Sequence, residues 1–440
     1  MTDAAQVYLE LLLQTQFLPP EKLMAYQASL VEPLVRHARE HVPFYRDSGR
    51  LNPLFTTENR IDWSRWEEIP VLTRVEAQKH TEALYSEVIP ENCGYVTTGY
   101  TTGSTGTPLR YRATSNLADV GTATLERALV WAGLPARLSL AWFMNDRQHE
   151  LAYPEGKTFR SEIRGEPRLI HFLAVQTSIE DQCRWLAKRR PDVVIGYPGA
   201  MAMLAENLTD ELKDHPFLLA ICVGEVTTGQ TRAMIERGFG CRVMDLYSGS
   251  EFGSVAAEDC TCGRLFISEE CLFVETRHRQ DVDFTDERPI ELIFTPFYNY
   301  AMPLIRYATG DFAVVDTEPP PDARTLRRLK RVAGRERNFF VLPSGRLWWP
   351  TYQSGVIATL LDYKQMQFAQ TAVDRIEVRF ASDRGEPIKD SEKLHAYLRR
   401  VTPEPMEIVI RRVEGIAQRP SGKYEYMTCE ITSPRSQNET

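Results

Sequence analysis

Residues 100–108, YTTGSTGTP, concentrate groups that could bind an anion. The stretch combines hydroxyl side chains with two glycines and contains no lysine. Because glycine adopts backbone angles that other residues avoid, such a loop can aim hydroxyls and backbone N–H groups at one phosphate. The missing lysine separates it from the GxxxxGK(S/T) loop of common NTPases. Taken alone, the stretch is more typical of a surface turn.

Four further motifs carry chemically useful side chains downstream of this loop. They are DLYSGSEFG (245–253), IRYATGD (305–311), GRERNF (334–339) and PSGKYEY (420–426). Each has a structural explanation of its own: Tyr247 could be a core residue, Asp311 a turn residue and Lys423 a solvated charge. Five motifs in this order and at this spacing are hard to explain as unrelated structural features.

The segments around these motifs predict a largely parallel sheet. Short apolar strands alternate with segments whose apolar residues recur at helical spacing. Strands are predicted over 192–195, 218–224 and 241–248, with helices over 200–212 and 227–239. Strands that alternate with helices imply βαβ units, and ligands of such sheets bind beyond the carboxyl ends of the strands. Gly224, Glu225 and Tyr247 fall at that edge.

Other segments predict the remaining architecture. Residues 20–45 are predicted to form a helix that ends at Pro43. After about residue 290 the sequence pattern favours short antiparallel strands, and the last hundred residues favour a small α+β domain. Residues 316–331 are proline-rich and then basic, which predicts a solvent-exposed connection and a domain boundary there. The fold class is therefore α/β.

Composition limits the partners. The 440 residues are 43% hydrophobic and 25% charged, as in ordinary globular proteins, and the net charge of −8 argues against nucleic acid or an anionic membrane as the main partner. The N-terminus lacks the pattern of a signal peptide, and no apolar run reaches the ~20 residues of a membrane helix. We therefore expect a cytoplasmic protein whose eight cysteines are reduced.

The motifs resemble those of the adenylate-forming (acyl-CoA synthetase-like) superfamily, most closely its phenylacetate–CoA ligase branch. The matching wording includes HVPFYR, IPVLTR (69–74), PDVVIGYP (191–198) and GEVTTGQTRAMIERGFGCRVMDLYSGSEFG, and the resemblance spans roughly residues 30–430. It implies a large N-terminal domain, 1–334, and a mobile C-terminal lid, 335–440. It also implies use of ATP and Mg²⁺ to convert a carboxylic acid into an acyl-adenylate, with CoA as the acyl acceptor.

The resemblance also assigns roles to individual residues. The β- and γ-phosphates of ATP would be held by Thr101, Thr102, Gly103, Ser104, Thr105 and Gly106. The adenine side would comprise Gly224, Glu225, Asp245, Leu246, Tyr247 and Ser248, with Asp311 and Arg335 at the ribose. Three residues would be catalytic: Ser250 near the α-phosphate, Glu251 on Mg²⁺, and Lys423, which the closing lid would bring to the carboxylate and α-phosphate.

The sequence departs from the family pattern in several places. The usual Tyr-Gly-x-Thr-Glu has Ser248 and Ser250 in place of Gly and Thr. The extra side chain of Ser248 would lie close to the acyl and adenine sites. The hinge position, often Asp or Lys, is Arg337, and Leu109 stands where many relatives have Lys.

A zinc site is not expected. Some relatives in this branch bind structural zinc through cysteines near Cys260, Cys262 and Cys271. Here the histidine position is Phe266, and residues 320–322 replace a second cysteine pair. Three ligands are fewer than the four that zinc prefers.

Aromatic and histidine residues between the phosphate loop and residue 196 have two interpretations. Trp142 and Phe143 could form an aromatic wall for a flat acid or could belong to the core. His149 and His171 lie in a region that lines the acyl pocket of relatives, but single histidines are usually structural.

Four functions remain open at this stage. The first is an acid:CoA ligase for an aryl or arylacetic acid. The second transfers the acyl group to an amine or a carrier-protein thiol, and the third moves AMP onto a phenolic hydroxyl. The fourth, a binding protein without catalysis, is disfavoured because Glu251, Asp311 and Lys423 are all present. Members of the branch often form homodimers, but no residue pattern here marks an interface.

Overall fold

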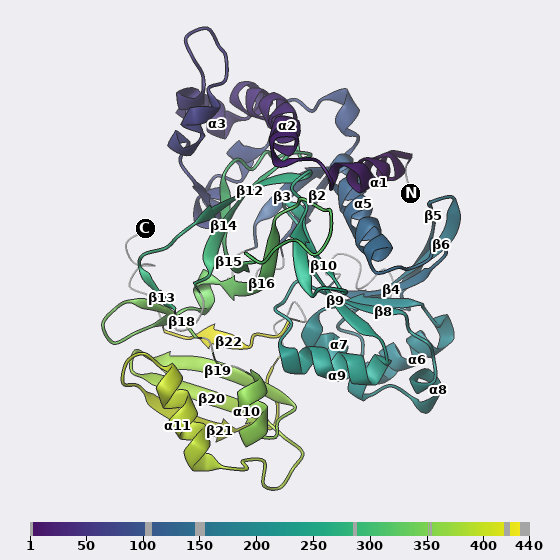
Figure 1. The fold of residues 1–440 in the computed structure, drawn as a ribbon, viewed down its shortest axis with the longest axis vertical. Coiled ribbons are helices and arrows are strands. Elements are labelled where there is room, and N and C mark those ends of the chain that lie inside the picture. Colours follow the sequence, from purple (N-terminus) through teal and green to yellow (C-terminus); the bar gives the residue numbers. More distant parts are fainter. Residues whose placement is uncertain are drawn as a thin grey trace.

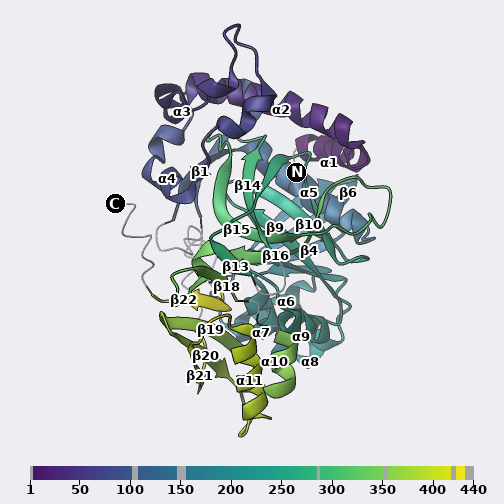
Figure 2. The same ribbon diagram turned by 60° about the vertical axis from the view of Figure 1, so that its left-hand side comes forward.

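The computed structural model describes residues 3–101, 108–145, 155–284, 288–350, 352, 354–417 and 423–431. Figure 1 shows a large body, built from the N-terminal part of the chain, and below it a smaller sheet that has its own helices. The same division is visible after rotation in Figure 2. Within the described part of the chain, no helix combines the length and apolarity needed to cross a membrane.

A mixed sheet forms the centre of the large body. Over the described residues it has thirteen strands in the order β12-β14-β15-β16-β11-β10-β9-β8-β7-β4-β6-β5, with β1 beside β15. Their bounds are β1 (Leu72–Thr73), β4 (Ser139–Met144), β5 (Lys157–Ile163), β6 (Glu166–Ala174), β7 (Val193–Gly196), β8 (Leu219–Val223), β9 (Arg242–Gly249), β10 (Gly253–Asp259), β11 (Arg264–Ile267), β12 (Leu272–Arg277), β14 (Ile290–Pro296), β15 (Tyr307–Val315) and β16 (Arg328–Arg335).

The half of this sheet from β9 to β6 is parallel, as the sequence predicts. Strands β9, β8, β7, β4 and β6 pair in parallel with one another. The helices of this half are α6 (Ile179–Arg189), α7 (Pro198–Glu206), α8 (Asp210–Lys213) and α9 (Gly229–Phe239). All five residues of β8 are buried, which explains its unbroken apolar sequence. The two predicted βαβ units, β7–α7–β8 and β8–α9–β9, are confirmed.

One helix of this half is shorter than predicted. The helical pattern after the Gly-Tyr-Pro-Gly turn extends to Leu212, but α7 ends at Glu206. Asn207 leaves the helical conformation, and Thr209 starts the separate short helix α8. Leu212 is nevertheless fully buried, so its apolar periodicity reports burial rather than a continuous helix.

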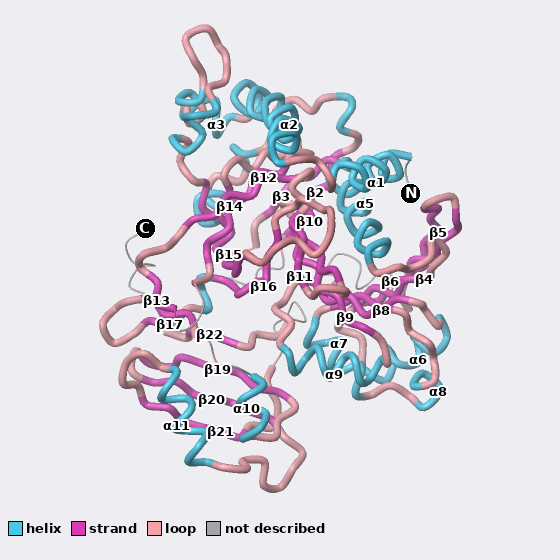
Figure 3. Tube along the Cα trace, in the orientation of Figure 1, coloured by secondary structure: helices cyan, strands magenta, loops and turns pink. Residues whose placement is uncertain are grey.

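The N-terminal helices cover the antiparallel half of the sheet at the upper end of the molecule (Figures 1 and 3). They are α1 (Asp3–Thr15), α2 (Pro20–His41), α3 (Pro43–Ser48), α4 (Arg74–Lys79) and α5 (Ser115–Trp131), with 3₁₀ turns η1 (Asn52–Leu54), η2 (Trp63–Glu68), η3 (Glu82–Leu84) and η4 (Glu91–Cys93). The predicted stop at Pro43 is confirmed. The same proline also opens α3, because a proline is well tolerated in the first turn of a helix.

The smaller sheet has its own core. It consists of β19 (Gln365–Ala372), β20 (Arg375–Ala381), β21 (Glu407–Arg412) and β22 (Met427–Cys429), with helices α10 (Ser354–Leu360) and α11 (Ser391–Val401). A second small sheet joins β13 (Val282–Phe284), β18 (Leu347–Trp349) and β17 (Phe340–Val341), after the turn η5 (Glu336–Asn338). The small α+β part is thus confirmed, whereas a boundary at residue 334 stays a prediction.

The prediction for residues 316–331 is wrong in part. This segment connects β15 to β16, which are neighbours in the large sheet, so no domain boundary falls there. Residues 317–323 are exposed, but Arg324 and Arg328 are buried. Arg328 pairs with Asp316 at 2.9 Å, and Arg324 pairs with Asp259. These buried aspartates need counterions, which explains the basic run.

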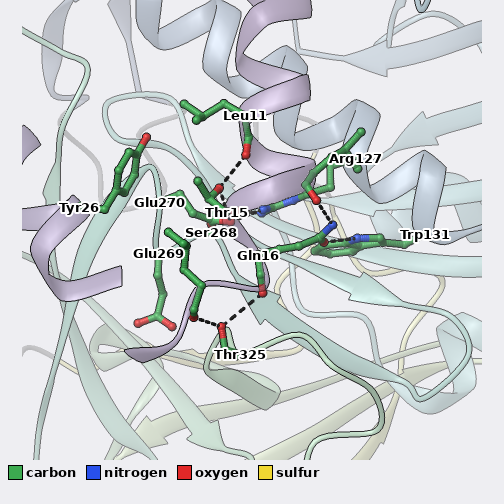
Figure 4. Close-up of polar contacts among 12 residues, drawn as sticks. Leu11, Thr15, Gln16, Tyr26, Arg127, Trp131, Ser268, Glu269, Glu270 and Thr325 are labelled. Carbon is green, nitrogen blue, oxygen red and sulfur yellow. Dashed lines mark hydrogen bonds and ion pairs between the residues drawn. The ribbon is translucent and has the colours of Figure 1, made fainter. Parts of the chain in front are cut away.

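A buried ion pair ties the N-terminal helices to the sheet (Figure 4). Arg127 of α5 lies 2.6 Å from Glu270, which follows β11, and both side chains are at most 1% exposed. The Arg127 guanidinium also donates to the hydroxyl of Ser268 at 3.2 Å. At the end of α1, the Thr15 hydroxyl donates to the Leu11 carbonyl at 2.9 Å and reaches Glu270 at 3.4 Å. One carboxylate thus holds two helices against the sheet.

Arg127→Met should lower the free energy of unfolding by about 3–5 kcal/mol, because it leaves the buried Glu270 carboxylate without a counterion. Replacing both partners by methionine should recover much of this loss. Arg46→Met is the matched control, since Arg46 and Glu87 form an exposed pair, and should leave the free energy of unfolding nearly unchanged. Urea unfolding followed by tryptophan fluorescence measures all three. An Arg127→Met effect no larger than that of the control would contradict the assignment.

Candidate functional site

A cavity of about 900 Å³ lies between the large sheet and the C-terminal part. Its walls come from the carboxyl ends of β8 and β9, from α7 and α9, and from the segment after β21. Nine residues assigned to the nucleotide site from sequence line it: Gly224, Glu225, Asp245, Leu246, Tyr247, Ser248, Asp311, Arg335 and Lys423. These residues are spread over about two hundred positions, so the fold, and not sequence proximity, brings them together.

Asp311 is the most heavily hydrogen-bonded carboxylate of this cavity. It lies opposite Arg335 in the β15–β16 pairing, and the Arg335 Nε–H donates to its Oδ1 at 2.8 Å. The hydroxyls of Tyr247 and Thr309 donate to Oδ2 at 2.9 and 2.7 Å. Burial favours the neutral acid, but the Arg335 charge and the two hydroxyls outweigh it and lower the pKa of Asp311 below its ordinary value. Asp311 is therefore an anion held rigidly by three donors.

Asp245, in the middle of β9, belongs to a second network. Its Oδ2 lies 3.2 Å from Arg232, and its Oδ1 accepts a hydrogen bond from the Thr227 hydroxyl. Its backbone N–H donates to Glu258 at 2.8 Å, and Glu258 pairs with the same Arg232 at 2.7 Å. Burial raises the pKa of Asp245 to about 6, against the opposing charge of Arg232. Protein groups thus occupy both of its carboxylate oxygens.

Glu251 contacts an arginine whose role the sequence did not suggest. The Glu251 side chain is 5% exposed, and its Oε1 accepts from Arg74 at 3.1 Å and from the Tyr307 hydroxyl at 3.4 Å. Arg74 also donates to the Thr101 hydroxyl at 2.7 Å. A single guanidinium therefore joins the predicted metal ligand to the first residue of the predicted phosphate loop. Arg74 ends the IPVLTR motif, which was the only available signal.

Thr101 is the one residue of the predicted phosphate loop that the structure describes. The loop connects β2 (Val96–Tyr100) to β3 (Arg110–Thr114), an antiparallel hairpin. Thr101 and Leu109 close it: the Thr101 N–H donates to the Leu109 carbonyl, and the Leu109 N–H donates to the Thr101 hydroxyl, both at 2.9 Å. Thr102, Gly103, Ser104, Thr105 and Gly106 lie outside the described residues. Leu109 is fully buried, so it serves the core.

The end of β9 and the turn after it contain the two serines that depart from the family pattern. Ser248 is half-buried in β9 and lines the cavity. Ser250 is exposed. Between them, a Cβ on Gly249 would lie 2.2 Å from the Phe252 ring, so only glycine fits there. Ser250 and Glu251 lie outside the lining of the main cavity.

Lys423 approaches the large body directly. Its Nζ donates to the Gly224 carbonyl at 2.9 Å and lies 5.0 Å from the centre of the Tyr197 ring. Gly224 follows β8 with φ of +76°, and a Cβ there would lie 2.9 Å from the Lys423 Nζ. Next to Lys423, the Tyr424 N–H donates to Glu225 at 2.6 Å. The C-terminal part therefore places a cation at the carboxyl end of β8.

Other sequence candidates belong to the core. Phe143 is 1% exposed and packs against Trp185. Trp142 stacks on Phe172 with centroids 5.7 Å apart. His171 bonds to Thr158 at 2.8 Å, and burial lowers its pKa. These contacts favour structural roles; His149 and the Arg337 side chain lie outside the described residues.

The three cysteines do not converge. Cys271 belongs to the cluster around the antiparallel strands, whereas Cys260 and Cys262 pack against two other apolar clusters. In the part of the chain that the structure describes, no three His, Cys, Asp or Glu side chains group in a way that could hold a metal ion. Burial raises the pKa of the Cys260 thiol to about 11, so this group is a weak candidate for a thiolate ligand.

Proteins similar to this chain include phenylacetate–coenzyme A ligases and a protein named CapK of Staphylococcus aureus. The chain is 27% identical over 344 residues to a phenylacetate–coenzyme A ligase of Escherichia coli, covering 73% of each chain. It is 25% identical over 361 residues to a phenylacetate–coenzyme A ligase of Thermus thermophilus, covering 79% of this chain and 78% of the relative. No protein-family model matches the chain.

Solved structures show the same fold. A 2-hydroxyisobutyryl-CoA ligase in the postadenylation state with 2-HIB-AMP superposes with a TM-score of 0.69 at 16% identity, over 95% of this chain and 92% of that one. The same ligase in the thioesterification state, with 2-HIB-AMP and CoA, gives 0.58 at 16% identity over 97% and 93%. By sequence the protein is a homologue of the phenylacetate–CoA ligases, and by fold it is similar to the adenylate-forming CoA ligases.

Proposed function

We propose that this protein is an AMP-forming ligase that activates an aryl or arylacetic acid as its acyl-adenylate and then transfers the acyl group to CoA. The observation that carries the proposal is the approach of Lys423 to Gly224, which places a cation at the edge of the cavity that Tyr247 and Asp311 line. The names of the relatives, phenylacetate–coenzyme A ligase, support the class of acid.

The first step needs positive charge at a defined place. A carboxylate oxygen attacks the α-phosphorus of ATP, the new P–O bond forms, and the bond to the β-phosphate oxygen breaks, releasing pyrophosphate. Charge builds on the α-phosphate and on the leaving group, so fixed donors and cations aimed there lower the barrier. Lys423 supplies such a cation only while its segment lies against Gly224. In the second step the thiol sulfur attacks the acyl carbon, and AMP leaves.

The nucleotide would be held by groups that are already ordered. A carboxylate has about four acceptor positions, and protein donors fill three of those of Asp311. For both ribose hydroxyls to bind there, one protein donor must move. Arg335 is the donor nearest the C-terminal part in sequence, so we propose that the ribose displaces it. The half-buried Tyr247 ring would face the adenine.

The residues around Glu251 fit Mg²⁺. Both hydrogen bonds to this carboxylate fall on Oε1, and the described residues donate none to Oε2. One carboxylate oxygen, together with phosphate oxygens and water, suits Mg²⁺. When bound, the ion would neutralise charge on the outer phosphates. Arg74, beside Thr101, would add a second positive charge on the same side.

Exchange of labelled pyrophosphate into ATP, measured over a panel of acids, tests the first step. We expect exchange with aryl or arylacetic acids, followed by thioester formation when CoA is added. If exchange occurs but the acyl group is then transferred only to an amine or a carrier-protein thiol, and not to CoA, the acyl acceptor would be reassigned. Absence of exchange with every acid, with AMP found instead on a phenolic hydroxyl, would refute the ligase.

Lys423→Ala should lower pyrophosphate exchange by about 10²–10³-fold, by analogy with the loss of one preorganised donor. Thioester formation from supplied acyl-adenylate should stay near the wild-type rate, since AMP departure needs no attack on ATP. Lys389→Ala, which removes a partly exposed lysine elsewhere in the C-terminal part, should change neither reaction. Normal exchange in Lys423→Ala would disprove the assigned role.

Arg74→Met should lower the exchange rate by about 10–100-fold, because a charge-assisted bond to Thr101 and the neighbouring Glu251 are both lost. Arg110→Met is the control. Arg110 lies on β3, in the hairpin whose loop begins at Thr101, but its pair with Glu82 is exposed, so exchange should be unchanged. Equal rates for the two variants would remove Arg74 from the site.

A further inference from the structure

We propose that Glu225 is a positioning residue that latches the lysine segment, residues 423–426, onto helix α7 and so fixes Lys423 in its place for adenylation. The inference rests on the proposed function and adds to it a residue that holds the catalytic lysine from the opposite body. Glu225, which lies in the cavity wall, would thus also bind the C-terminal part of the molecule.

The two oxygens of the Glu225 carboxylate have different partners. Oε1 accepts the backbone N–H of Tyr424 at 2.6 Å. Oε2 accepts the backbone N–H of Gly199, the second residue of α7, at 3.2 Å. Helix N-termini leave such N–H groups without a partner inside the helix. One side chain thus joins a helix of the large body to the main chain of the lysine segment, one residue from Lys423.

The latch is matched by a close contact next to it. A Cβ on Gly199 would lie 2.9 Å from the Tyr424 Cβ and 3.1 Å from its ring, closer than normal packing allows. The Tyr424 hydroxyl in turn donates to the Ile416 carbonyl at 2.6 Å, which fixes the ring from the other side. Glycine at 199 therefore lets Tyr424 approach, and Glu225 receives its N–H.

This geometry changes the role predicted from sequence. With both oxygens bonded to backbone N–H groups, the Glu225 side chain is already engaged in this arrangement. Both donors belong to the main chain, so the carboxyl group ties α7 and the lysine segment together at fixed points. The carboxylate is suited to holding the segment still rather than to recognising a base.

The latch has a pH signature. Burial raises the pKa of Glu225 to about 7 from 4.5, although the two N–H donors lower it. The titratable groups that face it are Lys423, Glu425, Tyr424, Tyr197 and Cys222. When the segment leaves, water returns and the pKa falls toward 4.5, so docking takes up a proton. The stabilisation that Glu225 gives to the docked segment is therefore full below pH 4.5 and is lost as the pH rises to about 7.

Three variants test the latch by activity. Glu225→Ala removes both bonds, and Gly199→Ala pushes Tyr424 away without altering the carboxylate. Both should lower pyrophosphate exchange by about 10–100-fold, and should lower it more strongly than they lower thioester formation from supplied acyl-adenylate. Gly121→Ala adds the same methyl group on α5, where no atom lies within 4 Å, and should change neither reaction.

Limited trypsin digestion gives a readout that needs no catalysis. The measured quantity is the rate of cleavage after Lys423 divided by the rate of cleavage after Lys389. This ratio should be larger in Glu225→Ala and Gly199→Ala than in wild type. In wild type the ratio should rise as the pH approaches 7, and in Glu225→Gln, which cannot titrate, it should stay flat.

The outcomes separate the two proposals. No exchange in wild type refutes the function, and the digestion ratio still decides the latch. Normal exchange in Glu225→Ala with an unchanged ratio refutes the latch alone. Equal loss of both half-reactions in Glu225→Ala also overturns it, because Glu225 would then serve the nucleotide site as a whole.

Discussion

The hydrogen bond from Lys423 to the Gly224 carbonyl joins two parts of the chain that are 199 positions apart. It forms because the carboxyl end of β8 turns through a left-handed glycine, which opens space that a Cβ would fill. Around it lie the Glu225 carboxylate, the Tyr197 ring, which faces the ammonium, and a cavity of about 900 Å³. If the segment shifted, the cavity would lose its cation and one of its walls together.

Charge placement follows burial throughout this region. Asp311, Asp245 and Glu251 each have an arginine partner, because a carboxylate removed from water needs a counterion or several donors. Glu225 differs, since its oxygens meet backbone N–H groups and its pKa rises to about 7. The site therefore contains three carboxylates that are paired with arginines and one, Glu225, that is held by backbone N–H groups.

Local patterns were enough to predict β7, β8 and β9 of the parallel half of the sheet, but not β4 and β6. Alternating strands and helices are visible in the sequence because β7 and β8 are buried on both faces and α9 has one buried apolar face. The pairing of Arg74 with Glu251 was not visible, because it joins residues 177 positions apart. Arg324 and Arg328 looked solvated, because a basic run shows its charges but not the buried aspartates that face them.

The contact between Arg335 and Asp311 lies at the junction between the large sheet and the C-terminal part. Arg335 ends β16, and η5 begins at the next residue, on the way to the C-terminal strands. If the sugar competes with this guanidinium, binding must perturb the junction, and linkage requires that movement of the junction alter sugar affinity to the same extent. Release of AMP and movement of the C-terminal part would then be coupled in one equilibrium. The turnover rate would therefore depend on this movement as well as on the chemical steps.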